Sequence, residues 1–355
     1  MAGTYDPTTH SFNGKEIQQL NEGIFEKVYE LPTLNEFHEV KTGIKAKEQV
    51  ALFGLLGMVG VAGGATCSTS VDTNQIGGSE KTWDPVQIEV RLTQCIKDLL
   101  PSFHAWAAKN GVNKPDMEGS AWLMFVEERL TYALEEAVLR HVWFGDTSLV
   151  SVTATPSGLL TAGVNKLYFN AFNGLWNQIF AIVTGDSTKR VTISENALGT
   201  KVLQSVLGAS TALTTFRALI NNADMRLRNQ PDKIMVVTQS LFDNYADYLE
   251  SQSFDASFLR LESGFTALRY RGVMIIPFEF WDRTITASFD NGTTYYRPHR
   301  AVLTVAENLQ IGLEEDGSFS NFNIWYEKKE KTNYIDAEFS LHALVIENYL
   351  IQTAY

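Results

Sequence analysis

The pattern of apolar and polar positions predicts a fold that mixes long strands with helices. Residues 83–92 and 334–345 alternate apolar with polar side chains, the two-residue period of a half-buried strand. The second stretch would reach about 41 Å at roughly 3.4 Å per residue. The segment 322–331 before it is expected to pair with it through a turn near Asn333. A long hairpin near the end of the chain follows from this pattern.

The longest helical pattern runs over residues 116–144, with Gly145 as its stop. A helix of this length spans roughly 42 Å at about 1.5 Å per residue, far more than an average globular helix. Two carboxylate pairs, Glu127–Glu128 and Glu135–Glu136, lie on it. Adjacent residues on a helix point in different directions, so neither pair converges on a substrate. These acids are expected to lie on faces of the helix that meet solvent or a neighbouring subunit.

Between the long helix and the hairpin, residues 195–300 predict a compact α/β lobe. It comprises, in order, a helix over 213–227 that ends before Pro231, a buried strand over 233–237, a helix over 240–251 and a second buried strand over 272–277. The chain is expected to leave an elongated domain, build this insert and return.

A glycine-rich apolar run extends from Phe53 to Cys67. The uncharged stretch around it, residues 50–65, is shorter than the roughly 20 residues that cross a bilayer. Neither the phosphate-loop nor the dinucleotide glycine pattern is present, which leaves backbone that must bend or pack closely. The polar residues 63–82 that follow predict a long exposed loop. With the strand after it, this part of the chain forms a two-stranded excursion with a flexible tip.

Composition and charge limit the function. At 355 residues with 45% hydrophobic content, the chain can bury a sizeable core. A net charge of −12 argues against a protein that binds nucleic acid through a basic surface, although not against one that encloses it. Cys67 and Cys95 form no ligand cluster and are expected to be free thiols. The opening residues lack a secretory-signal pattern, so synthesis and assembly in a cytoplasm are expected.

No catalytic or metal-binding constellation is evident. The six histidines have no metal-ligand spacing, so neither a metal nor another cofactor is expected. Ser240 follows a strand where an esterase would place its nucleophile, but Thr238 and Phe242 occupy the positions that need glycine. Ser240 is better interpreted as a helix N-cap. A structural role is favoured over an enzyme, and a soluble α/β hydrolase with Ser240 as nucleophile is the alternative of another class.

The order of these segments resembles the major capsid proteins of tailed bacteriophages, with the Hong Kong 97-type α+β fold. The corresponding parts are an N-terminal arm (1–47), an extended loop (48–95), a peripheral domain with the spine helix (96–194), an inserted axial domain (195–300) and return strands of the peripheral domain (301–355). At residue level, SEKTWDPVQIEV is similar to the returning strand of the capsid loop and RHVWFGD to the end of the spine helix. LRYRGVMIIPFEFWDRTI and RPHRAVLTVAENLQIG resemble the axial lobe in phages of Bacteroidetes-type hosts.

The resemblance implies self-assembly into pentamers and hexamers that form an icosahedral shell around double-stranded DNA, in a virion assembled in the host bacterial cytoplasm. It implies no membrane partner, and it suggests scaffolding, portal and possibly decoration proteins. The arm is too short for a built-in scaffold, so a separate scaffolding protein, or none, is expected. The nearest competitor is an encapsulin-type compartment, which shares the fold.

In such capsids the extended loop reaches over a neighbouring subunit. The residues expected to serve this inter-subunit loop are Gly63, Gly64, Gly77, Gly78, Lys81 and Trp83. Some relatives cross-link a loop lysine to an asparagine of the next subunit. Lys81 is the lysine near the loop tip, and the sequence identifies no partner for it.

Overall fold

The structure is a computed structural model, and its strands and helices are grouped in two units. It describes residues 37–41, 43–44, 47–53, 78–95, 133–152, 159–252, 259–260, 266–313, 322–327 and 332–355. Of these residues, the larger unit contains those within 32–88, 137–318 and 340–355, and the smaller one contains those within 89–136 and 319–339.

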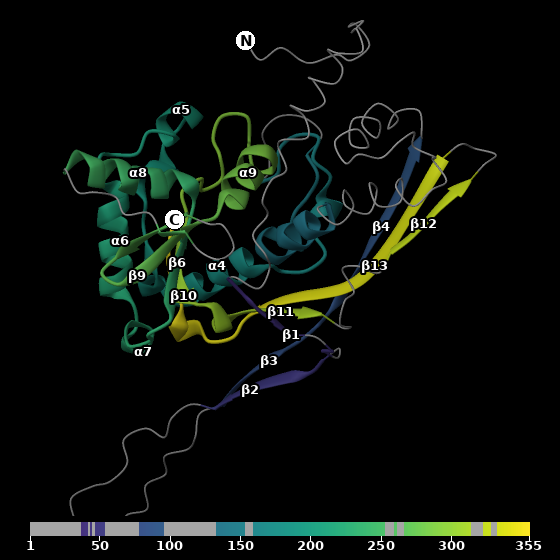
Figure 1. The fold of residues 1–355 in the computed structure, drawn as a ribbon, viewed down its shortest axis with the longest axis horizontal. Coiled ribbons are helices and arrows are strands. Elements are labelled where there is room, and N and C mark those ends of the chain that lie inside the picture. The colour runs from purple at the N-terminus through teal and green to yellow at the C-terminus, as the bar shows by residue number, and fades with distance from the viewer. Residues whose placement is uncertain are drawn as a thin grey trace, which may run out of the picture. The chain divides into compact units, whose positions relative to one another are not determined.

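A seven-stranded mixed sheet forms the centre of the larger unit (Figure 1). Its strands, in spatial order, are β5 (Arg190–Val191), β14 (Gln352–Ala354), β10 (Ala301–Val305), β6 (Lys233–Val237), β9 (Val273–Pro277), β8 (Thr266–Tyr270) and β7 (Leu259–Arg260). The two buried strands expected from their apolar runs are β6 and β9, which pair in parallel. The sheet extends beyond the expected insert 195–300, because β5, β10 and β14 join it.

Two helices cover one face of this sheet, α6 (Thr211–Asn222) and α8 (Gln239–Ser251). Phe216 of α6 and Tyr245 of α8 meet with ring centroids 5.4 Å apart. Both rings belong to a buried cluster with Met235 of β6 and Ile275 of β9. Burial of such side chains contributes on the order of 1.5–3 kcal/mol each. This cluster is the core of the inserted lobe.

The single helix expected over residues 213–227 is wrong. Helix α6 ends at Asn222, and a separate short helix, α7, spans Met225–Arg228. Asp224 is the reason, because its carboxylate accepts the backbone N–H of Arg226 at 2.9 Å and caps the new helix. Leu227 is still buried in the same cluster as Phe216, so the apolar spacing identified the right face.

A second core consists of aromatic side chains. The indoles of Trp143, Trp176 and Trp281 lie with centroids 4.6–5.9 Å apart. They come from the helix that ends at residue 144, from α4 (Leu175–Gly185) and from α9 (Glu279–Ser288). Phe278 packs against Trp281 at 5.5 Å and against Phe37 at 5.2 Å. Edge-to-face contacts of this kind add to the burial of large apolar surfaces.

The described part of the long helix covers residues 133–144, and it ends before Gly145 as expected. The expected residues 116–132, including Glu127–Glu128, lie outside the described residues. Glu135 and Glu136 are half-buried, and burial raises the pKa of Glu135. No described helix has the length and hydropathy needed to cross a bilayer.

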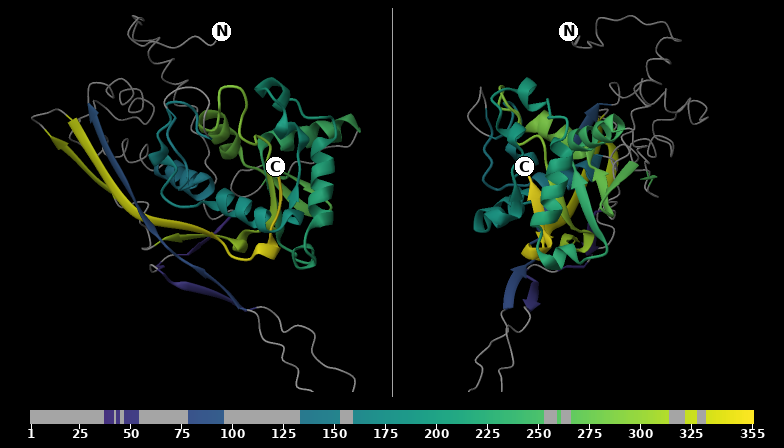
Figure 2. Two further views of the ribbon diagram at one scale, coloured as in Figure 1. Left: turned by 180° about the vertical axis from the view of Figure 1, so that it is seen from behind. Right: turned by 90° about the vertical axis from the view of Figure 1, so that its left-hand side faces the viewer.

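The long strand near the end of the chain is β13 (Thr332–Val345), and it contacts three other strands of a five-stranded sheet. Its second half pairs with β11 (Leu309–Leu313), and β1 (Glu39–Lys41) adds in parallel beyond β11. Its first half pairs with β12 (Phe322–Glu327). The strand β4 (Val86–Cys95) also pairs with β13 (Figure 2).

In the smaller unit, β12 and β13 form the expected hairpin, but the turn near Asn333 is wrong. Asn333 pairs with Tyr326 inside the ladder, so the connection lies between Glu327 and Thr332. The lysine-rich sequence between the two strands supplies no glycine to mark its turn. Arg91 of β4 lies 3.3 Å from the carboxylate of Glu338 on β13.

The glycine-rich excursion begins and ends as an antiparallel pair, β2 (Gln49–Phe53) with β3 (Gly78–Thr82). The exposed loop expected over residues 63–82 is therefore wrong for its last five residues, which form β3. The cause is pairing with β2, which a polar strand sequence does not reveal. Gly63, Gly64, Cys67 and Gly77 lie outside the described residues.

Candidate functional site

Trp83 connects the base of the excursion to the five-stranded sheet. Its indole is buried with Ile44, Leu344 and Ile346 and meets the ring of His342 at 5.8 Å. Its backbone donates to the carbonyl of Glu48 at 2.9 Å. Sequence reasoning identified Trp83 as a loop residue but missed these partners, because none lies near it in the sequence.

Gly312 on β11 leaves the space that the indole fills. A Cβ at this position would lie 2.7 Å from Cζ3 of Trp83 and 2.4 Å from Cδ1 of Ile44. A methyl group cannot occupy that space unless the neighbouring side chains move. The glycine is therefore needed for the close approach of the indole to the strand.

Lys81 also contacts its own chain. Its ammonium group donates to the carbonyl of Val345 and, at 3.0 Å, to Oδ1 of Asn348. Burial lowers the pKa of Lys81 to about 8, although the carboxylate of Glu347 acts in the opposite direction. Gly78 is the first residue of β3. The expected inter-subunit role of this loop stays a prediction, since Gly63, Gly64 and Gly77 are outside the described residues.

A cavity of about 800 Å³ opens next to Lys81. Acids and bases line it together with apolar residues of α4 and β13. Arg226 stacks on the ring of Tyr349 at 3.7 Å and pairs with the carboxylate of Asp224.

The Ser240 hydroxyl donates to a buried histidine that sequence reasoning did not connect with it. Its Oγ lies 2.7 Å from Nδ1 of His299. Nε2 of the same ring lies 2.6 Å from the carbonyl oxygen of Gln204, which can only accept, so Nε2 carries the proton. Burial lowers the pKa of His299.

This pair has the contact of a nucleophile and a base, but not the surroundings of an active site. His299 is only 3% exposed, and its second nitrogen is bound to a backbone carbonyl. Ser240 is the second residue of α8, and Thr238 is the N-cap, so the N-cap interpretation of Ser240 is wrong. Asp282 explains this, because its carboxylate accepts the backbone N–H of Gln239 at 2.8 Å and satisfies the start of the helix.

Burial raises the pKa of Asp282 to about 7, and the backbone hydrogen bonds at the start of α8 oppose this rise. The folded protein therefore holds this proton more tightly than the unfolded chain. The contribution of Asp282 to stability is fully present at low pH and is lost as the pH rises from about 4 through about 7.

Replacing Asp282 with asparagine should remove this dependence, because the amide keeps an acceptor for Gln239 without a charge. Relative to Asp282→Asn, the wild type should lose about 2 kcal/mol of unfolding free energy between pH 5.5 and 8, at about 1.4 kcal/mol per pKa unit. Urea unfolding of both proteins at the two pH values measures this difference in unfolding free energy. Asp247→Asn, an exposed change on α8, the helix whose start Asp282 contacts, should keep the pH dependence of the wild type. Parallel pH profiles for wild type and Asp282→Asn would show that Asp282 does not titrate in this range.

Among the described residues, no group of three His, Cys, Asp or Glu side chains is arranged to hold a metal ion.

Comparison with known proteins identifies the fold. No family model matches the chain, and no curated protein matches it. Its fold is similar to the structure of Mycobacterium phage Adephagia, with a TM-score of 0.52, 10% identity, and coverage of 97% of this chain and 98% of that one. The structure of Gordonia phage Cozz gives a TM-score of 0.51 at 13% identity, covering 90% of this chain and 84% of that one. These neighbours are phage major capsid proteins, and this α+β chain has their Hong Kong 97-type fold.

Proposed function

We propose that the chain is a major capsid protein that assembles into pentamers and hexamers and forms an icosahedral shell around phage double-stranded DNA. The observation that carries this proposal is the mutual coverage with the Adephagia structure, 97% of this chain and 98% of that one. The similarity includes almost the whole of both chains, so it is not limited to one common sheet motif.

Two features of the chain support the proposal. The β2–β3 excursion is fixed at its base by Trp83 and Lys81, which suits a loop that extends to a neighbouring subunit. The net charge of −12 suits a shell that encloses DNA without binding it tightly as a free subunit. The inter-subunit residues of the loop would then be Gly63, Gly64, Gly77 and Gly78, together with Lys81 and Trp83 at its base.

We also propose which partners the chain has and where in the infected cell and the virus particle it is found. The chain would associate with copies of itself, with portal and scaffolding proteins, and with any decoration proteins on the finished shell. It would be made in the host bacterial cytoplasm and end in the virion. An encapsulin-type compartment remains the alternative with the same fold, and particle content separates the two, since one encloses DNA and the other a protein cargo.

A hydrolase is the second candidate, and the hydrogen bond between Ser240 and His299 is the observation that favours it. The burial of His299 opposes it, because a general base must reach the substrate. A hydrolase would react with a serine-directed acylating probe, and the label would be lost in Ser240→Ala.

Sedimentation velocity of the purified protein, expressed alone and with its scaffold, tests the proposal. Megadalton species or capsomers are expected because every subunit repeats the same contacts. A monomer at high concentration in several salt conditions, with Ser240 labelled by the probe, would favour the hydrolase.

A further inference from the structure

A pocket of about 340 Å³ is lined by two segments that lie far apart in the sequence. Residues 196–199 and Gln204 form one part of its wall, and residues within 289–297 form most of the rest. Arg297 is the one charged side chain among the described residues that line it. The whole chain has 41 acids against 29 Lys and Arg, so this wall has the opposite charge balance and favours an anionic occupant.

The positive charge of Arg297 is not neutralised by another described residue. Its Nη1 is buried, and no described group accepts a hydrogen bond from it. The guanidinium is instead surrounded by aromatic rings, with Cζ 4.2 Å from the ring centroid of Tyr355, 4.3 Å from that of Phe180 and 5.0 Å from that of Tyr296. Such rings stabilise a cation but carry no net charge. The guanidinium therefore keeps its charge and its unused donors.

A second guanidinium, that of Arg300, faces two of the same rings. It lies 5.6 Å from the centroid of Phe180 and 5.7 Å from that of Tyr296. Burial lowers the pKa of Arg300 to about 9, and the charge of Arg297 acts in the same direction. An anion beside Arg297 would offset the repulsion between the two cations.

The backbone at Arg297 has an unusual conformation. Its φ is 50°, in the left-handed region that residues other than glycine rarely adopt. Arg300 holds this turn, because its guanidinium donates to the carbonyls of Tyr296 and Arg297, both at 2.9 Å. Backbone outliers of this kind are concentrated at functional sites.

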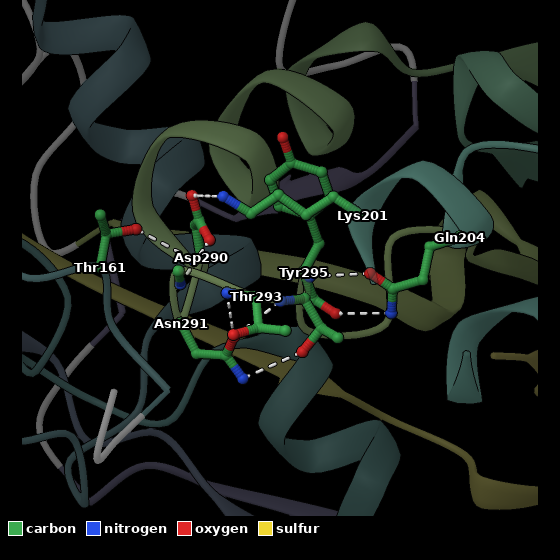
Figure 3. A network of polar contacts seen from close by, with 9 residues as sticks. Thr161, Lys201, Gln204, Asp290, Asn291, Thr293 and Tyr295 are labelled. Atoms are coloured by element: carbon green, nitrogen blue, oxygen red, sulfur yellow. Dashed lines mark hydrogen bonds and ion pairs between the residues drawn. The ribbon is translucent and has the colours of Figure 1, made fainter. Parts of the chain in front are cut away.

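Hydrogen bonds fix other parts of the pocket wall (Figure 3). Oδ1 of Asn291 accepts the backbone N–H groups of Thr293 at 3.0 Å and Thr294 at 2.7 Å. Gln204, the last residue of α5 (Lys201–Gln204), accepts the backbone N–H of Tyr295 at 2.8 Å and donates to its carbonyl at 3.1 Å. These amides are engaged within the wall, so the pocket is preformed and the entropic cost of binding is low.

We propose that this pocket binds a small organic anion. A carboxylate or phosphate group would meet Arg297, whose planar fork of donors matches oxyanions. The apolar body of the ligand would cover Leu159, Leu198 and Phe289, which also line the pocket. The volume is within the range of small-molecule sites. Binding does not require assembly, so this inference and the proposed function can fail independently.

Titration calorimetry of the purified protein with phenyl phosphate tests the proposal, because this probe joins an oxyanion to an apolar ring. The wild type should bind it saturably. Arg297→Gln should weaken binding at least about tenfold, because charge-assisted hydrogen bonds are lost. Arg190→Gln is the matched control. Arg190 also lies over the Tyr355 ring, at 5.4 Å, but it does not line the pocket, so affinity should stay within about twofold.

Leu198→Glu gives a second variant that leaves the stacking of Arg297 intact. Leu198 is 38% exposed, so the variant should fold, which its melting transition checks. The new carboxylate should weaken binding of phenyl phosphate, whereas Leu198→Gln should have the smaller effect. Absence of saturable binding to folded wild type, equally tight binding of phenol or of inorganic phosphate, or wild-type affinity in both Arg297→Gln and Leu198→Glu would overturn the inference.

Discussion

Replacing Gly174 with alanine is expected to destabilise the protein severely. Gly174 precedes α4, and its backbone N–H donates to the carbonyl of Gly145 at 2.8 Å. A Cβ at Gly174 would lie 2.6 Å from the carbonyl oxygen of Val142, 2.7 Å from that of His141 and 2.8 Å from the nitrogen of Gly145. All three atoms belong to the backbone, so no side chain can rotate away to relieve the contact.

The end of the long helix and the start of α4 would have to separate. The contact between Trp143 and Trp176 bridges these two elements, so the aromatic core would loosen with them. Overpacking in a core commonly costs 1–3 kcal/mol, and three backbone contacts place this substitution at about 3 kcal/mol or more. Urea unfolding of the free subunit measures it.

Gly185, the last residue of α4, provides the matched control. No described atom lies within 4 Å of a Cβ built there, and alanine has the higher helix propensity by about 0.8–1 kcal/mol. Gly185→Ala should therefore be neutral or slightly stabilising. Equal effects of the two substitutions would show that the approach of Gly174 to the helix end is not as close as described.

Trp83→Ala, at the base of the excursion, is expected to lower the free energy of unfolding about as much as Gly174→Ala. The indole is 2% exposed, and truncation of a buried tryptophan costs about 3–5 kcal/mol. The β2–β3 pair would lose its main apolar contact with the sheet, so shells should also fail to form in conditions where the wild type assembles. Unfolding free energy and particle counts measure the two effects.

Gly312→Ala tests the same contact from the opposite side. Alone it should destabilise by about 2 kcal/mol, because the new methyl meets the indole. In the Trp83→Ala background the indole contacts are gone and only Cδ1 of Ile44, the end of a flexible side chain, still lies close to the methyl, so the same methyl should cost less. The double variant should therefore be more stable than the sum of the single effects predicts. Additive effects would contradict the packing of Trp83 on Gly312.

The pattern of apolar and polar residues correctly predicted the helices and strands whose form is set by neighbouring residues in the sequence. The apolar run Lys233–Val237, the helix after it and the alternating strand that ends at Val345 were all confirmed. In each case the period of the apolar residues is set by the face that the element buries. The break at Asp224 was missed because a cap depends on one side chain, whereas the apolar period continues through Leu227.

Contacts between distant residues could not be predicted in the same way. Ser240 was noticed, but His299 lies 59 residues further along the chain. Nothing in the sequence around Gly312 marks it as special. The absence of a Cβ at this position matters only because Trp83, which is distant in the chain, packs against it. β3 was mistaken for loop because its polar sequence forms a strand only through its pairing with β2.

Electron microscopy of the purified protein tests the central claim most directly. The account predicts closed icosahedral shells, or capsomers and tubes built from pentamers and hexamers, whether the chain is expressed alone or with its scaffold. Uniform monomers or small oligomers in every salt condition, from protein that is folded by its melting transition, would contradict it.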